Sequence, residues 1–133
     1  MSRAPILDDL DDLCDLLNPR ALIVPHPVTD RDKLSALAQA MQSNGWTESP
    51  IVAFDEIALC GVHRLAAAHE ADILVPVIQL TRHADTLWGE GTLADIEEAI
   101  TDWDDVGVMT ATITSVLRRR DDRLSEVLGL DAY

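Results

Sequence analysis

Four short apolar runs, separated by segments with helical character, constrain the fold of this chain more than any other feature. The runs are rich in Ile, Leu, Val and Ala, and proline or glycine interrupts or ends most of them, which is typical of β-strands. Two runs are separated only by Asp55-Glu56 and predict a hairpin. Pro76, inside the last run, predicts an edge strand or a strand start. The runs lie at 21–24, 49–54, 57–60 and 73–80.

Amphipathic spacing, with apolar residues three or four positions apart, marks two of the intervening segments as helices. Residues 5–17 place leucines between aspartates, and this helix should end before Pro19 because the residue preceding a proline disfavours helical geometry. A second helix is expected between a cap in Thr29-Asp30 and a stop at Asn44-Gly45. The alanine-rich segment 62–71 is a third. Together with the runs, these helices predict an α+β fold with a small mixed β-sheet.

Acidic residues are concentrated outside the middle of the chain. The 133 residues include 24 Asp or Glu and 10 Lys or Arg, which gives a net charge of −14. The composition shift after residue 83 predicts three parts. They are an N-terminal amphipathic helix (1–20), an α+β core (21–83) and an acidic helical C-terminal extension (84–133).

The net charge excludes a broad nucleic-acid surface, since sequence-independent binding to a polyanion needs a face rich in Lys and Arg. The acidic helices at the two ends are instead candidate surfaces for a protein partner. We expect a cytoplasmic protein without membrane contact, because neither a secretory pattern nor a bilayer-length apolar run is found. Cys14 and Cys60 do not form a disulfide framework.

One motif, Gly61-Val62-His63-Arg64, combines the end of a predicted strand with the start of a predicted helix. Glycine permits a tight turn, and the unpaired N–H groups of a helix N-terminus attract anions. Arginine is suited to phosphate because its planar fork binds two oxygens at once. Lys33, in the first turn of the preceding helix, is a further candidate anion ligand. The structural alternative is that Arg64 and Lys33 pair with nearby acids.

Residues 22–80 resemble the ParB/sulfiredoxin-like superfamily, specifically its ParB N-terminal-like domain. The resemblance covers about 59 of 133 residues and rests on the order and spacing of five segments rather than on any one of them. These are Ile23-Val24-Pro25-His26-Pro27, Asp30-Arg31-Asp32-Lys33, Ser49-Pro50-Ile51-Val52, Gly61-Val62-His63-Arg64 and Val75-Pro76-Val77-Ile78. The resemblance implies that ATP or CTP is bound, with Lys33, Gly61, His63 and Arg64 around the phosphates.

Two departures from the superfamily's patterns limit what the resemblance implies. Val62 stands where sulfiredoxins have the catalytic cysteine just before the His-Arg pair, so reduction of a sulfinic acid is not expected. Val62 and His63 also replace the Glu and first Arg of the ParB box, and no basic helix-turn-helix segment follows. We interpret Cys60 as a small buried apolar residue.

The activity that fits the resemblance is a small phosphotransferase or an NTPase, because phosphoryl transfer mainly needs positioning, charge neutralisation and a base. Asp30, Asp32 and Glu48 are candidates for the base or for a Mg²⁺ ligand, with helix capping or simple solvation as the structural alternative. No residue set has the spacing of a protein-bound metal site. The alternative hypothesis is a non-enzymatic partner-binding or regulatory module, and a third is mimicry of DNA by the acidic surface.

Overall fold

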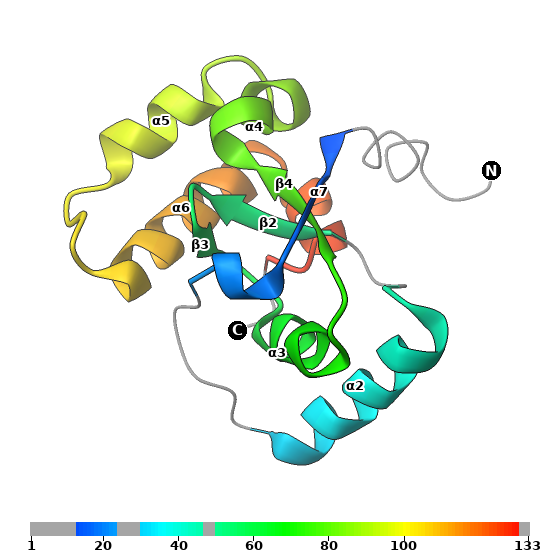
Figure 1. The fold of residues 1–133 in the computed structure, drawn as a ribbon. Helices are drawn as coiled ribbons and strands as arrows, with labels where there is room; N and C mark the ends of the chain where they lie inside the picture. Colours follow the sequence, from blue (N-terminus) through cyan, green and yellow to red (C-terminus); the bar gives the residue numbers. More distant parts are fainter. Residues whose placement is uncertain (1–12, 24–29, 47–49, 131–133) are drawn as a thin grey trace.

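The computed structural model describes residues 13–23, 30–46 and 50–130 of the chain (Figure 1). Glu48 and the segment 24–29 therefore lie outside the described residues, as does most of the expected N-terminal helix. The elements, in chain order, are β1 (Asp15–Leu17), the short 3₁₀ helix η1 (Pro19–Ala21), α2 (Arg31–Asn44), β2 (Ile51–Phe54), β3 (Ile57–Ala58), α3 (Val62–Ala71), β4 (Val75–Gln79), α4 (Leu80–Trp88), α5 (Thr92–Ala99), α6 (Val106–Arg120) and α7 (Asp122–Val127).

The four strands form one mixed sheet in the order β1-β4-β2-β3. β2 and β4 run parallel to each other, whereas β1 pairs with β4 and β3 pairs with β2 in antiparallel fashion. The hairpin predicted at Asp55-Glu56 is present, and Asp55 takes up the positive φ of 53° that its tight turn requires. The predicted α+β class with a small mixed sheet is confirmed.

Each face of the sheet is covered by its own set of helices (Figure 1). Successive residues of a strand point to opposite faces, and β2 follows this rule. Ile51 and Ala53 join a core with α2 and α3, whereas Val52 and Phe54 join a core with α4 to α7. All four side chains are almost completely buried. The molecule is therefore a three-layer structure of helices, sheet and helices.

The acidic C-terminal segment is helical, but it is part of the same folded unit as the sheet. Ile78 of β4, Trp88 of α4 and Ile113 of α6 belong to one continuous core. That core extends to Leu128 and Leu130, both of which have no exposed surface. Full burial of a leucine contributes about 1.5–3 kcal/mol, so these helices add substantially to stability. The predicted boundary after residue 83 does not separate two structural domains.

The helix expected at 5–17 does not continue to Leu17, because Asp15–Leu17 is a strand that pairs with β4. Of the two alternatives predicted for Pro76, the strand start is the one observed, because Pro76 is the second residue of β4, which is an interior strand. The sheet accepts Pro76 because β4 begins to pair with β2 only at Val77, one residue later, so the missing N–H removes no bond between these strands.

The helix predicted between Asp30 and Gly45 is confirmed at both ends. The Asp30 carboxylate accepts a hydrogen bond from the Lys33 N–H at 2.9 Å, and Gly45 follows the last helical residue with a φ of 73°. The strand expected at 21–24 is not formed in the described residues 21–23, because Ala21 ends the 3₁₀ helix η1 and Ile23 forms only a single parallel bridge to Ile57. Among the described residues, every helix is too short or too polar to cross a lipid bilayer.

Candidate functional site

The start of α3 is an open helix N-terminus beside the parallel strands. Gly61 occupies the N-cap position in the left-handed conformation, with φ 72° and ψ 36°, and supplies no side-chain cap. The first hydrogen bond of the helix runs from the Leu65 N–H to the Gly61 carbonyl at 2.8 Å. The N–H groups before Leu65 belong to the set that a helix leaves without intrahelical partners, and such groups bind anions.

His63 joins this helix N-terminus to that of α2. Its Nε2 atom accepts a hydrogen bond from the backbone N–H of Asp30 at 3.2 Å, and α2 and α3 lie side by side (Figure 1). Nε2 of the half-buried His63 is thus occupied as an acceptor, which leaves Nδ1 as the nitrogen of this ring that can donate to a ligand.

Of the other predicted residues near the start of α2, Asp30 has a structural role and two are exposed. The Asp30 carboxylate caps α2 by accepting the Lys33 N–H, which is the helix capping given above as the alternative to a catalytic role. Asp32 and Lys33 are exposed on the first turn of α2. The third acidic candidate, Glu48, cannot be placed because it lies outside the described residues.

The Arg64 side chain folds back over Gly61 and lies close to Trp46 and Gly129, which are in the connections before β2 and after α7. Its guanidinium carbon lies 5.7 Å from the centroid of the Trp46 ring, a cation–π arrangement. A Cβ atom placed on Gly61 would lie 2.9 Å from Arg64 Nη2, and one placed on Gly129 would lie 3.5 Å from the same atom. Arg64 thus stands beside the α3 N-terminus and also connects the start of α3 with the α2–β2 and C-terminal segments.

Cys60 is a buried thiol immediately before the glycine turn. Its Sγ atom donates to the Leu128 carbonyl at 3.5 Å. Burial raises the pKa of Cys60, and this effect outweighs the opposite influences of the Val52 backbone and the Arg64 guanidinium. The residue is therefore a protonated thiol at neutral pH, and its 2% exposure agrees with the interpretation of Cys60 as a small buried apolar side chain.

The structure brings Gly61, His63 and Arg64 together at the α3 N-terminus, and the hydrogen bond from the Asp30 N–H places the first turn of α2, which carries Lys33, against His63. The Arg64 guanidinium faces Trp46, beyond the other end of α2. Sequence reasoning missed Trp46, whose ring the Arg64 guanidinium faces, and Gly129, where an added Cβ would lie 3.5 Å from Arg64 Nη2. Both contacts join segments that are distant in the chain, so no local pattern could have indicated them. Within the described ranges no group of three or more His, Cys, Asp or Glu side chains could hold a metal ion.

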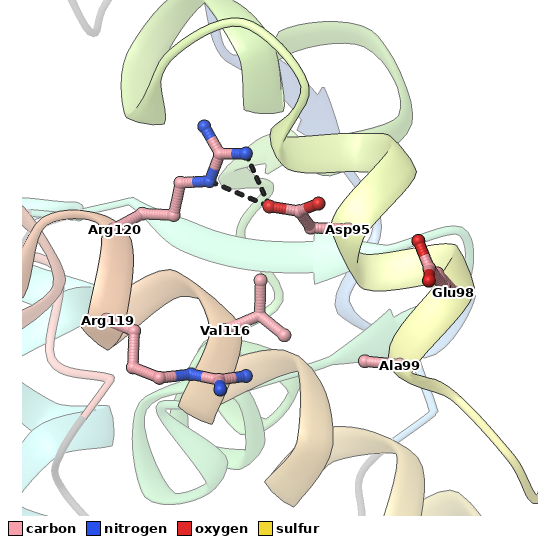
Figure 2. A pocket seen from close by; sticks show the side chains of 6 residues that line it. All are labelled: Asp95, Glu98, Ala99, Val116, Arg119 and Arg120. Atoms are coloured by element: carbon pink, nitrogen blue, oxygen red, sulfur yellow. Dashed lines mark hydrogen bonds and ion pairs between the residues drawn. The ribbon is translucent and has the colours of Figure 1, made fainter.

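A second feature is a groove between α5 and α6 with a volume of about 560 Å³ (Figure 2). Its walls are formed by Asp95, Glu98, Ala99, Val116, Arg119 and Arg120. The Arg120 guanidinium is fixed within the protein, because it donates to the Asp95 carboxylate and, at 2.9 Å, to the Glu90 carbonyl. Arg118 pairs with Asp122 at 2.9 Å, so two members of the arginine cluster at the end of α6 have internal acidic partners.

Comparisons of the chain with models of known protein families, with curated proteins and with solved structures found no match. The resemblance to the ParB/sulfiredoxin-like superfamily therefore stays a prediction from the sequence. The two features of the structure that bear on function are the neighbouring N-termini of α2 and α3 and the groove between α5 and α6.

Proposed function

We propose that this protein binds a nucleoside triphosphate, ATP or CTP, where the N-termini of α2 and α3 meet. The observation that carries the proposal is the hydrogen bond between His63 and the Asp30 N–H, which holds the two helix starts against each other. Each start contributes the positive end of a helix dipole. Two neighbouring helix N-termini attract a phosphate chain more strongly than either does alone.

The side chains at this junction supply the complementary charge. Lys33 is exposed on the first turn of α2, where its cation is unfavourable for the helix itself. A bound phosphate would reverse that disadvantage. Arg64 lies beside the Gly61 turn, and His63 offers Nδ1–H. In a molecule with a net charge of −14, such a local group of donors supports the binding of a small anion without a basic surface.

The proposed activity is phosphoryl transfer or NTP hydrolysis. In that reaction Lys33 and Arg64 offset the charge that develops on the transferred phosphoryl group, and helix N–H groups orient it. Asp32 is the described carboxylate best suited to act as base, because it is exposed on the same turn as Lys33 whereas Asp30 is occupied as the cap. Mg²⁺ bound to the nucleotide would supply further charge neutralisation.

The test is isothermal titration calorimetry with ATP and with CTP, each with and without Mg²⁺, on wild-type protein and on Lys33→Ala. Hydrogen bonds to charged groups contribute about 1.5–3 kcal/mol, so losing Lys33 should weaken binding by at least tenfold. Arg123→Ala, an exposed arginine on α7, is the matched charge control and should leave the affinity unchanged. Arg64→Ala is less informative, since it also removes the contact with Trp46.

Two results would contradict this proposal. One is the absence of binding at millimolar nucleotide in protein whose circular dichroism shows a folded state. The other is equal loss of affinity in Lys33→Ala and Arg123→Ala, which would mean that only the net charge matters.

We also propose, as a second candidate, that the protein is a non-enzymatic partner-binding module. This candidate is supported by the charge of one continuous region. Residues 84–117 contain eight Asp or Glu and no Lys or Arg, and they include α5 and most of α6. A surface so strongly biased in sign favours association with a cationic molecule.

A further inference from the structure

The groove between α5 and α6 is a specific surface on which the partner of the second proposed function could bind. We infer that this groove binds a cationic segment of a partner protein, and the inference is independent of nucleotide binding at α2 and α3. The groove lies in the other helical layer, across the sheet from those two helices (Figure 1).

The charges of the groove are only partly balanced within the protein. Asp95 and Arg120 neutralise each other and form a fixed wall (Figure 2). Glu98 is exposed on the α5 side, and in the described part of the chain it forms no ion pair. Glu98 is therefore the carboxylate of the groove that is left for a cationic side chain from outside.

The floor of the groove is apolar. Val116 of α6 lies between the arginines and the α5 carboxylates, and Ala99 lies on the α5 side below Glu98 (Figure 2). Val116 is 4% exposed and already belongs to the core, so the floor is firmly supported. An apolar strip beside a carboxylate suits an amphipathic segment, which places aliphatic side chains on the strip and a Lys or Arg against Glu98.

The surroundings of the groove favour a positive occupant over other possibilities. Beyond Glu98, the connection from α5 to α6 carries the exposed residues Asp102, Asp104 and Asp105. A second copy of this chain would bring another net charge of −14 and the same acidic helices, which long-range repulsion opposes. A basic segment instead gains attraction at the end of α5 that carries Glu98 and continues to Asp102.

Of the two arginines that line the groove, Arg120 pairs with Asp95 and Arg119 does not. The position of Arg119 sets the orientation that we expect for a bound segment. The Arg119 Nε atom donates to the Ser115 carbonyl at 3.4 Å, and the side chain is exposed near the end of α6. Because α5 and α6 form a hairpin, Arg119 lies toward one end of the groove and Asp102 toward the other. A bound segment would therefore place an acidic residue at Arg119 and its basic residues toward Asp102.

The probe for the test is a 14-residue amphipathic peptide of Lys and Leu with one Glu near its end. Binding is followed by the backbone amide shifts of ¹⁵N-labelled full-length protein. The expected result is that shifts concentrate in α5 and the second half of α6. Glu98→Arg should weaken binding by roughly tenfold, because one exposed attraction is lost and a repulsion is gained.

The control is Glu70→Arg, which makes the same charge change at an exposed position on α3. It should weaken binding by less than about twofold, as expected for a distant screened charge. Replacing the peptide's Glu by Gln should weaken binding to the wild type and leave binding to Arg119→Ala unchanged. The three protein variants, Glu98→Arg, Glu70→Arg and Arg119→Ala, change exposed residues and should keep the wild-type melting temperature.

Three outcomes would overturn the inference. The first is no binding of the peptide at millimolar concentration. The second is equal weakening by Glu98→Arg and Glu70→Arg, which would show attraction to net charge alone. The third is a set of shifts spread over all acidic surfaces instead of α5 and α6.

Discussion

Replacement of Gly61 by alanine should be among the most damaging single changes near the candidate site. Two separate costs follow from the structure. Gly61 has a φ of 72°, and an L-residue in the left-handed region costs about 1–2 kcal/mol. A Cβ atom would also lie 2.6 Å from Ile51 Cδ1, a side chain with no exposed surface. Making room in a packed core costs about 1–3 kcal/mol. The sum is about 2–5 kcal/mol.

The chain contains a matched control in Gly129. Gly129 also has a positive φ, 77°, and follows α7 in a Schellman arrangement, with the Leu130 N–H bonded to the Ser125 carbonyl. A Cβ atom there would meet Arg64 Nη2 at an ordinary 3.5 Å. Gly129→Ala should therefore cost only the conformational part, about 1–2 kcal/mol. The difference between the two variants measures the close approach at Gly61.

Urea unfolding at pH 7 gives both free energies, and thermal melting gives an independent check. For 133 residues, an unfolding entropy of about 2.1 cal/mol/K per residue corresponds to roughly 3–4 °C for each kcal/mol. Gly61→Ala should melt well below Gly129→Ala. If the two variants are equally stable, Ile51 and Arg64 do not enclose the glycine turn, and the description of the α3 N-terminus given above is wrong.

Three further predictions concern other parts of the structure. Backbone N–H groups at the start of α5 donate to the Asp85 carboxylate and lower its pKa. Asp85→Asn should therefore lower the free energy of unfolding at pH 7, and this loss should become smaller as the pH falls below about 4 and Asp85 is protonated in the wild type. Urea unfolding at several pH values measures the difference. Cys60 should react with Ellman's reagent only on unfolding, because burial raises its pKa; mass spectrometry of the labelled peptide identifies the site. Trp88→Phe should cost about 1 kcal/mol in urea unfolding, because the indole N–H donates to Ser125 Oγ at 3.1 Å inside the core. An unchanged free energy for Trp88→Phe would argue against that buried bond.

The elements that sequence reasoning located correctly are those whose signals are local. The cap at Asp30 and the stop at Gly45 are side-chain and backbone preferences that act within one helical turn, and α2 begins and ends as they predict. The hairpin at Asp55 is similar, since its two strands are neighbours in the chain. The α+β class follows from the same alternation of short apolar runs and helices.

The elements that it missed depend on distant partners. Asp15–Leu17 has the leucine spacing of a helix but becomes a strand because β4 offers a free edge about 60 positions later. Pro76 was expected at an edge or at a strand start, and it lies at the start of β4; that β4 is an interior strand depends on its distant pairing with β2. At the candidate site, spacing and resemblance predict Gly61, His63 and Lys33, and these stay predictions, whereas the packing of Arg64 on Trp46 is a tertiary contact that no local pattern indicates.

The burial of Leu128 and Leu130 has a consequence for the order in which this protein is made. A ribosome delivers β2, β4 and the helices α2 and α3 first, and these can cover one face of the sheet while synthesis continues. The opposite face, with Val52 and Ile78, keeps apolar surface uncovered until residue 130 has emerged. A nascent chain stalled in α6 or α7 would thus cover this face with α4 and α5 only, and the apolar side chains that pack on Leu128 and Leu130 would stay uncovered.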